Sequence, residues 1–293
     1  MKRAVFIGAG DLSVRAALEL VDVGWQVHTL RRSERPVKKP LVGHRADITD
    51  PAALAQVAWP RADALVVCVA PGRTDEAAYR SVYGAGVTNV LTALRDRALL
   101  PRRVVFVSTT AVYGQRDGEP VDESAPTSPS RFNGAVMIDA ERQIASCGSA
   151  EYVVARLGGI YGPGRSRFLD RVRAGEERVG GATRDACTNR IYVDDAARAI
   201  TFLVTHPDPP SIVNVVDDEP ARRSIVVRWL AQRLAVAVPV DDDRPITARR
   251  SSERVDDKRV SNARLRSLGF DLRYPTFRDG YAALLAGSTQ PGS

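Results

Sequence analysis

Residues 4–13 read AVFIGAGDLS, an apolar run followed by two glycines one residue apart. A buried strand that enters a glycine turn and then a helix is typical of the first unit of a doubly wound α/β domain that binds a dinucleotide. Gly8 allows the tight turn, and Gly10 lets the backbone approach the pyrophosphate at the positive end of the helix. Ser13 stands where the usual third glycine would be, so an ordinary strand–helix turn remains an alternative. The residues expected to bind the cofactor here are Gly8, Gly10, Asp11 and Leu12.

The bulk composition is that of a globular protein, with 44% hydrophobic and 26% charged residues among 293. The apolar runs are strand-sized, so we expect no membrane span and no membrane partner. The cysteines Cys68, Cys147 and Cys187 have neither paired nor metal-type spacing, which predicts a reducing cytoplasm and no metal site. The net charge is +7, but acidic residues interleave with the basic ones, so we expect no nucleic-acid partner.

Strand-like and helix-like segments alternate along the chain. Valine-rich runs at 64–69, 104–107 and 152–155 predict strands buried on both faces, and helical patterns at 76–100 and 134–146 separate them. This order predicts an α/β fold with a Rossmann-type doubly wound parallel sheet and a small C-terminal substrate-binding region. We assign residues 1–157, completed by about 189–217, to the NAD(P)-binding domain, and residues 158–188 and 218–293 to the substrate-binding region. Residues 241–243 and 249–252 are expected in an exposed loop.

The end of the second predicted strand indicates which dinucleotide binds. The carboxylate that would accept hydrogen bonds from the ribose hydroxyls of NAD is missing there. Arg31, Arg32 and Ser33 occupy its place. Guanidinium groups suit a 2′-phosphate, so these residues favour NADP, with NAD as the alternative. Asp47 and Ile48, after the next strand, are placed to meet the adenine, although this segment is also a good helix start.

Four later segments carry a family resemblance. They are residues 107–114 (VSTTAVYG), 156–165 (RLGGIYGPGR), 189–195 (NRIYVDD) and 214–220 (NVVDDEP). They resemble the extended short-chain dehydrogenase/reductase superfamily, in the segments that its NAD(P)-dependent epimerases and dehydratases share. The resemblance spans nearly the whole chain, and it implies a Rossmann-type sheet with a small C-terminal substrate region.

The resemblance also implies site residues. Val69, Ala70 and Pro71 would border the nicotinamide ribose, and Ser108 would contact the cofactor. Thr109 takes the place of the serine or threonine that hydrogen-bonds the reacting oxygen of the substrate.

The family's catalytic tyrosine and lysine do not occur at the positions that match. Counting back from Glu141, these positions fall on Asn133 and Met137, and no tyrosine or lysine lies between Gly118 and Glu151. The chain thus resembles the atypical members of the superfamily, which lack the Tyr-x-x-x-Lys pair. Tyr161, in a segment that reads as a loop facing substrate, is a candidate replacement for the acid.

The leading hypothesis is an NADP-dependent oxidoreductase acting on a small carbonyl or hydroxyl compound. The alternative is a non-catalytic NADP-binding regulatory or sensor protein, which the missing pair favours. A sugar-nucleotide epimerase or dehydratase would need the missing groups. Arg165, Arg167, Arg171 and Arg173 fit either an anionic substrate or a solvated helix face. A homodimer through the helices at 76–100 and 134–146 is expected by resemblance.

Overall fold

The computed structural model describes residues 1–34, 36–179, 185–238 and 256–287. The loop predicted around 241–243 and 249–252 lies outside them, as do parts of the predicted substrate-binding region. The described chain divides into two compact units. The first unit comprises Met1–Val112, Pro129–Arg156 and Ala196–Val213, and the second comprises Tyr113–Ser128, Leu157–Asp195 and Asn214–Ser293.

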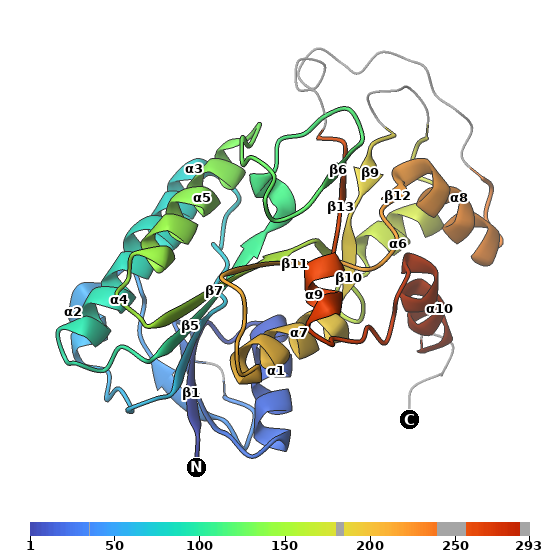
Figure 1. Cartoon of the computed structure of the whole chain (residues 1–293). Coiled ribbons are helices and arrows are strands. Elements are labelled where there is room, and N and C mark those ends of the chain that lie inside the picture. The colour runs from blue at the N-terminus through green and yellow to red at the C-terminus, as the bar shows by residue number, and fades with distance from the viewer. Residues whose placement is uncertain (35, 180–184, 239–255, 288–293) are drawn as a thin grey trace. The chain divides into compact units, whose positions relative to one another are not determined.

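A parallel seven-stranded sheet forms the frame of the first unit, in the order β11-β7-β5-β4-β1-β2-β3 (Figure 1). This is the doubly wound order, and the strand order reverses between β1 and β4, where such folds bind dinucleotides. The predicted fold class is therefore confirmed. The strands are β1 (Arg3–Ile7), β2 (Gln26–Arg31), β3 (Val42–Arg45), β4 (Ala64–Val67), β5 (Arg103–Thr109), β7 (Glu151–Leu157) and β11 (Ile212–Val215).

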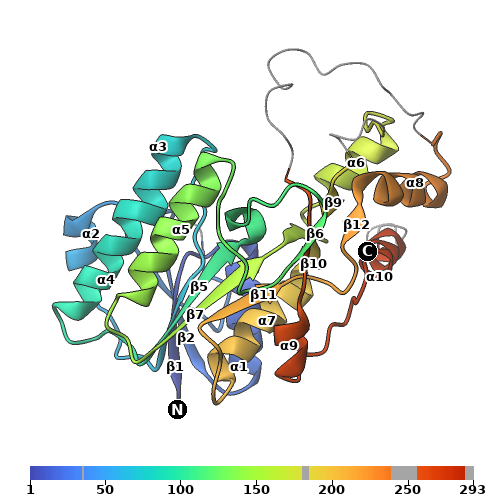
Figure 2. The same cartoon turned by 45° about the horizontal axis from the view of Figure 1, so that its top comes forward.

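Helices cover both faces of this sheet (Figures 1 and 2). On one face α1 and α7 lie together, joined by a hydrogen bond from the Thr201 hydroxyl to the Ala16 carbonyl. On the other face lie α3, α4 and α5. The helices are α1 (Asp11–Asp22), α2 (Pro51–Ala55), α3 (Glu76–Tyr79), α4 (Val87–Arg95), α5 (Phe132–Ala145) and α7 (Val193–Thr205).

The helix expected over residues 76–100 is wrong in two respects. A π-helical segment, η1 (Arg80–Gly86), separates α3 from α4, and α4 ends at Arg95 rather than Leu100. Two glycines in η1 weaken the regular helix, and π-helical turns often accompany functional sites. The C-terminal end is set by Ala98, whose positive φ of 52° is incompatible with a continuing helix.

The second unit is built from short strands that pair across large sequence separations. β8 (Gly159–Tyr161) pairs with β10 (Arg190–Tyr192), β9 (Cys187–Thr188) with β12 (Ala221–Arg222), and β6 (Glu119–Val121) with β13 (Lys258–Val260). Its helices are α6 (Arg167–Arg173), α8 (Arg223–Arg233), α9 (Ala263–Ser267) and α10 (Phe277–Gly287), and the short helix η2 (Thr110–Val112) follows β5 in the first unit. No helix in the described part of the chain is long and apolar enough to cross a membrane.

Candidate functional site

The glycine turn after β1 has the geometry that a dinucleotide requires. Gly8 has a φ of +101°, and a Cβ atom there would lie 2.2 Å from the Cys68 carbonyl oxygen. A Cβ atom at Gly10 would meet nothing within 4 Å, so the backbone at the start of α1 is open. Gly10 is the N-cap of α1 and offers no side chain to the first helical amides. These amides are thus placed to receive an anion.

The serine that replaces the third glycine has a structural explanation. The Ser13 side chain is buried, and its hydroxyl donates to the Cys68 carbonyl at 3.1 Å, which ties α1 to the end of β4. Leu12 is also buried, so only its backbone can contact a cofactor. The Asp11 carboxylate pairs with Arg15 one turn along the helix.

The two arginines after β2 differ in what they contact. Arg31 donates to the carbonyls of Ser33 and Pro36, so its guanidinium is held by its own loop. The Arg32 side chain is 72% exposed and lies 3.8 Å from the Asp47 carboxylate. Its other terminal nitrogen lies 3.5 Å from where a Cβ of Gly72 would be. Arg32 therefore reaches over the loops that follow β3 and β4, where an adenosine ribose would lie in such a fold.

Asp47 and Ile48 are held by neighbours that define the loop after β3. The Asp47 carboxylate accepts from the Thr49 amide and hydroxyl, and despite partial burial these bonds hold its pKa below the usual range. The Ile48 carbonyl accepts from the Asn89 side chain at 3.1 Å. The N-cap of α2 is Asp50, whose carboxylate accepts from two helical amides. Asp50 therefore caps α2. Asp47 is not needed for the start of this helix and lies in the loop at the carboxyl end of β3.

A tyrosine that the sequence analysis missed positions the loop after β4. The buried Tyr83 in η1 donates its hydroxyl to the Val69 carbonyl at 2.9 Å. Burial raises the pKa of Tyr83, so the hydroxyl stays protonated and remains a donor. Val69, the residue before Ala70 and Pro71, is thus held by η1 through its carbonyl. The sequence signal that could have indicated this role is Tyr83 next to Gly84 and Gly86, which interrupt the predicted helix.

Ser108 belongs to a buried network. Its hydroxyl donates to Glu141 on α5 at 2.5 Å, and Arg156 on β7 donates to both oxygens of the same carboxylate. All three residues are buried. The Ser108 side chain therefore fixes α5 to the sheet, and cofactor contact by this residue is left to its backbone.

Thr109, the last residue of β5, is half-buried. Its hydroxyl oxygen accepts from the Ala111 amide at 3.2 Å, and its proton is available to another acceptor. The first turn of α5 packs close by, since a Cβ at Gly134 would lie 2.4 Å from the Ala111 carbonyl oxygen. In that helix Asn133 is half-buried, and Met137 is buried one turn later. The fourteen residues of α5 include neither tyrosine nor lysine.

The expectation that Tyr161 lies in a loop is wrong. It is the last residue of β8, is 4% exposed, and packs against Tyr192 and Tyr281. Burial, reinforced by the nearby Asp217 carboxylate, raises its pKa. A strand of three residues between glycines has too little pattern to be distinguished from a loop.

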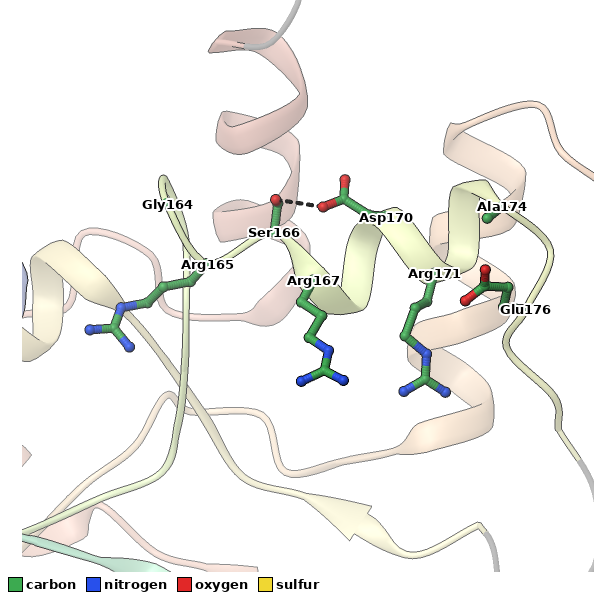
Figure 3. Close-up of a pocket in the computed structure, with 8 residues that line it drawn as sticks. All are labelled: Gly164, Arg165, Ser166, Arg167, Asp170, Arg171, Ala174 and Glu176. Carbon is green, nitrogen blue, oxygen red and sulfur yellow. Dashed lines mark hydrogen bonds between the residues drawn. The ribbon is translucent and has the colours of Figure 1, made fainter. Parts of the chain in front are cut away.

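Of the four arginines singled out in the sequence, the structure brings three to one pocket of the second unit. Arg165, Arg167 and Arg171 line it (Figure 3). Arg173 instead pairs with Asp170. Among the described residues no cluster of histidine, cysteine and acidic side chains is arranged to hold a metal ion.

Comparison with known proteins identifies the family. The model of the NAD dependent epimerase/dehydratase family matches residues 10–215. A Methylobacillus flagellatus structure, assigned by its name to the NAD-dependent epimerases/dehydratases, is 35% identical and superposes with a TM-score of 0.83 over 99% of both chains. Protein YeeZ of Escherichia coli K12 is 27% identical over 94% of this chain and 97% of its own.

Two more distant structures share the fold and carry a cofactor. The UDP-glucose 4-epimerase of Thermus thermophilus, in complex with NAD, is 22% identical with a TM-score of 0.80 over 97% of this chain and 98% of its own. The human epimerase family protein SDR39U1, with NADPH, is 18% identical with a TM-score of 0.78 over 97% of this chain and 99% of its own.

Proposed function

The chain belongs to the NAD-dependent epimerase/dehydratase family, and on that premise we propose that it is an NADP-dependent oxidoreductase acting on a small carbonyl or hydroxyl compound. The observation that carries the choice of NADP is the position of Arg32. Its guanidinium is exposed, reaches over the loops after β3 and β4, and stands where an NAD-binding chain would have a carboxylate. The human relative with NADPH supports the same choice, and the Thermus relative with NAD supports the alternative.

The residues of the first unit divide the binding work. The open backbone at Gly10 and the uncapped amides of α1 would hold the pyrophosphate, and Arg32 would hold the 2′-phosphate. When bound, the cofactor would supply or accept a hydride. The Thr109 hydroxyl would donate a hydrogen bond to the substrate oxygen on which charge develops.

Calorimetric titration with NADPH and NADH at one ionic strength tests the proposal. We expect Arg32→Ala to weaken NADPH binding by about tenfold or more, because a charge-assisted pair is lost, and to leave NADH binding unchanged. Arg45→Ala is the matched control, since Arg45, the last residue of β3, is also exposed and pairs with Glu34. An unchanged NADPH-to-NADH ratio in Arg32→Ala would contradict the assignment of NADP.

A second candidate function is a non-catalytic NADP-binding regulator or sensor. The composition of α5 favours it, because that helix supplies neither tyrosine nor lysine. Thr109→Ala separates the two candidates. As an oxidoreductase the protein should lose about a hundredfold in NADPH oxidation while it still binds NADPH. If no small carbonyl compound supports NADPH oxidation by the wild type, and NADPH binding is intact, the regulator is the better description.

We also propose a cytoplasmic location and a homodimer formed through α5 and the α3–η1–α4 segment. Sedimentation of the purified protein tests the dimer directly, and a monomer at micromolar concentration would overturn it.

A further inference from the structure

The helix that follows β4 contacts both loops between which a dinucleotide would lie in the first unit. α3, η1 and α4 run on as one helix beside α5, and η1 interrupts it with π-helical hydrogen bonds (Figures 1 and 2). A π-helical turn holds one residue more than an α-helical turn, and such turns are frequent at functional sites. The residues of this helix that contact the two loops are Tyr83, Gly86 and Asn89, each three positions after the last.

Tyr83 is a fixed hydrogen-bond donor to the loop after β4. Its ring packs edge-on against the buried Phe106 of β5, with the ring centroids 6.4 Å apart, and its hydroxyl donates to the Val69 carbonyl at 2.9 Å. Because burial raises the pKa of Tyr83, the hydroxyl keeps its proton at neutral pH. Tyr83 therefore holds the loop, and it does not replace the family's catalytic tyrosine, which must exchange a proton.

Gly86 and Asn89 hold the loop after β3 through Ile48. A Cβ atom at Gly86 would lie 2.8 Å from the Ile48 side chain, so glycine allows the helix to approach the loop this closely. The Asn89 side-chain amide donates to the Ile48 carbonyl at 3.1 Å. The next residue back, Asp47, lies 3.8 Å from Arg32, so this loop also contacts the residue proposed to hold the 2′-phosphate.

Other residues of the same helix contact α5 instead. The Tyr79 ring packs edge-on against the ring of Phe132, at the start of α5, with the centroids 5.5 Å apart. The Thr88 hydroxyl donates to the Gln143 side chain at 2.7 Å. The helix therefore presents one set of residues to α5 and another to the loops of the cofactor site, and the two sets can be changed separately.

We propose that Tyr83, Gly86 and Asn89 are positioning residues for the dinucleotide, and that they support its two ends separately. Tyr83 supports the nicotinamide end, because it holds the loop expected to border the nicotinamide ribose. Gly86 and Asn89 support the adenosine end, because they hold the loop expected to meet the adenine. A loop that is held before the ligand arrives loses less conformational entropy on binding. The inference rests on the proposed function, since it takes the ligand to be NADP.

The test compares calorimetric titrations with NADPH and with 2′,5′-ADP, which carries the 2′-phosphate but no nicotinamide. We expect Tyr83→Phe to weaken NADPH binding by about fivefold and to leave 2′,5′-ADP binding within about twofold, because the lost hydrogen bond supports the nicotinamide end. Asn89→Ala and Gly86→Ala should weaken the binding of both probes by about fivefold, because both probes contain the adenosine end. A general weakening of the fold would not separate the two probes.

The matched controls change residues of the same helix that contact α5. Tyr79→Phe removes a tyrosine hydroxyl and keeps the ring that packs against Phe132. Thr88→Val removes the hydroxyl that donates to Gln143. Both variants should bind the two probes with wild-type affinity. Melting temperatures show whether each variant is folded.

Hydrogen exchange of the protein without cofactor separates this proposal from the proposed function. Tyr83→Phe should accelerate exchange at residues 69–73 and not at 46–50, and Asn89→Ala should do the reverse. Unchanged exchange at 69–73 in Tyr83→Phe would overturn the proposal, and so would an equal loss of NADPH and 2′,5′-ADP affinity in that variant. If the wild type binds neither probe, the proposed function is wrong, and the exchange pattern still decides whether these residues hold the two loops.

Discussion

The two units of this chain are stabilised in different ways. In the first, seven parallel strands form a continuous ladder, and buried apolar side chains from every strand except β3 fill the space beneath the helices. In the second, the paired strands have only two or three residues, so they form few ladder hydrogen bonds. Buried polar side chains instead hydrogen-bond to backbone groups of segments far away in the sequence. Examples are Asp195, which accepts two amides near residue 273, and Lys258, which donates to the Tyr113 carbonyl.

This difference decides where each unit can be changed. A repetitive ladder fixes positions through the backbone, so the first unit depends on glycines and on a few buried charges that join helix to sheet. The second unit depends on individual polar side chains that hold distant segments together. The predictions below test this contrast.

The largest expected effect comes from Arg156, in the first unit. Arg156→Ala leaves the Glu141 carboxylate buried without its cation, and breaking such a pair costs about 3–5 kcal/mol of unfolding free energy. Urea unfolding measures it. Arg142→Ala is the control on α5, since its pair with Asp139 is exposed and should contribute less than about 0.5 kcal/mol. A cost below about 1 kcal/mol for Arg156→Ala would show that the network does not join α5 to the sheet.

A glycine substitution in each unit gives the second test. Gly8→Ala combines a positive φ with a Cβ placed 2.2 Å from the Cys68 carbonyl, and we expect it to cost about 3 kcal/mol. Gly164→Ala has the positive φ but open space around it, and should cost about 1 kcal/mol. Urea unfolding of both variants separates the cost of backbone strain alone, at Gly164, from that of strain combined with a steric clash, at Gly8. Equal costs would mean that the approach of β1 to β4 is not what requires Gly8.

The sequence predicted the first unit well, because its signals are local. Valine-rich runs predicted the buried strands, and the glycine turn after β1 has the predicted geometry. The role of Gly8 could be predicted because only a glycine fits a tight turn. The helix over residues 76–100 was predicted only in part, because periodicity does not distinguish an α-helix from one with a π-helical turn.

Contacts between distant residues could not be predicted. Nothing in the sequence distinguishes Arg31, held by its own loop, from Arg32, which is exposed. The network of Ser108, Glu141 and Arg156 joins three separate elements, and Tyr161 lies in a strand too short to show a pattern. Such contacts depend on tertiary packing, which a single sequence does not contain.

Asp195 gives the third prediction and tests the second unit's dependence on single polar groups. Asp195→Ala removes the acceptor of the Arg273 and Tyr274 amides, and we expect a loss of about 2 kcal/mol. Hydrogen exchange should accelerate at residues 273–287 before it does so elsewhere in the unit. Asp271→Ala, which removes an exposed carboxylate paired with Arg266, should leave exchange unchanged. Unchanged exchange in Asp195→Ala would show that these amides do not depend on that carboxylate.

The smallest expected effects, roughly 1 kcal/mol for each pH unit, are dependences of stability on pH, which run in opposite directions in the two units. In the first, burial beside His44 and Arg3 lowers the pKa of His28 to about 4. The unfolded chain therefore binds a proton that the folded chain does not between about pH 4 and 6.5, and stability rises with pH there. In the second, burial raises the pKa of Asp217 to about 8, against the Glu219 amide and the charge of Arg190. The folded chain then keeps a proton that the unfolded chain has lost, and stability falls as pH rises from about 4 to 8.

Each of these two slopes can be removed by a single substitution, so the test is urea unfolding of Asp217→Asn and His28→Gln at pH 5, 6.5 and 8. Asparagine resembles the neutral carboxyl, whose buried Oδ2 has no hydrogen bond among the described residues. Of these two groups, only Asp217 lies between its unfolded and folded pKa values above pH 6.5. Asp217→Asn should therefore remove a decline in stability of roughly 1 kcal/mol per pH unit in that range, and His28→Gln should leave the decline unaltered. Below pH 6.5 the two slopes oppose each other and nearly cancel in the wild type, so His28→Gln should reveal the decline that Asp217 causes. If Asp217→Asn keeps the decline above pH 6.5, Asp217 is ionised in the folded protein, and its buried charge must be balanced by Arg190.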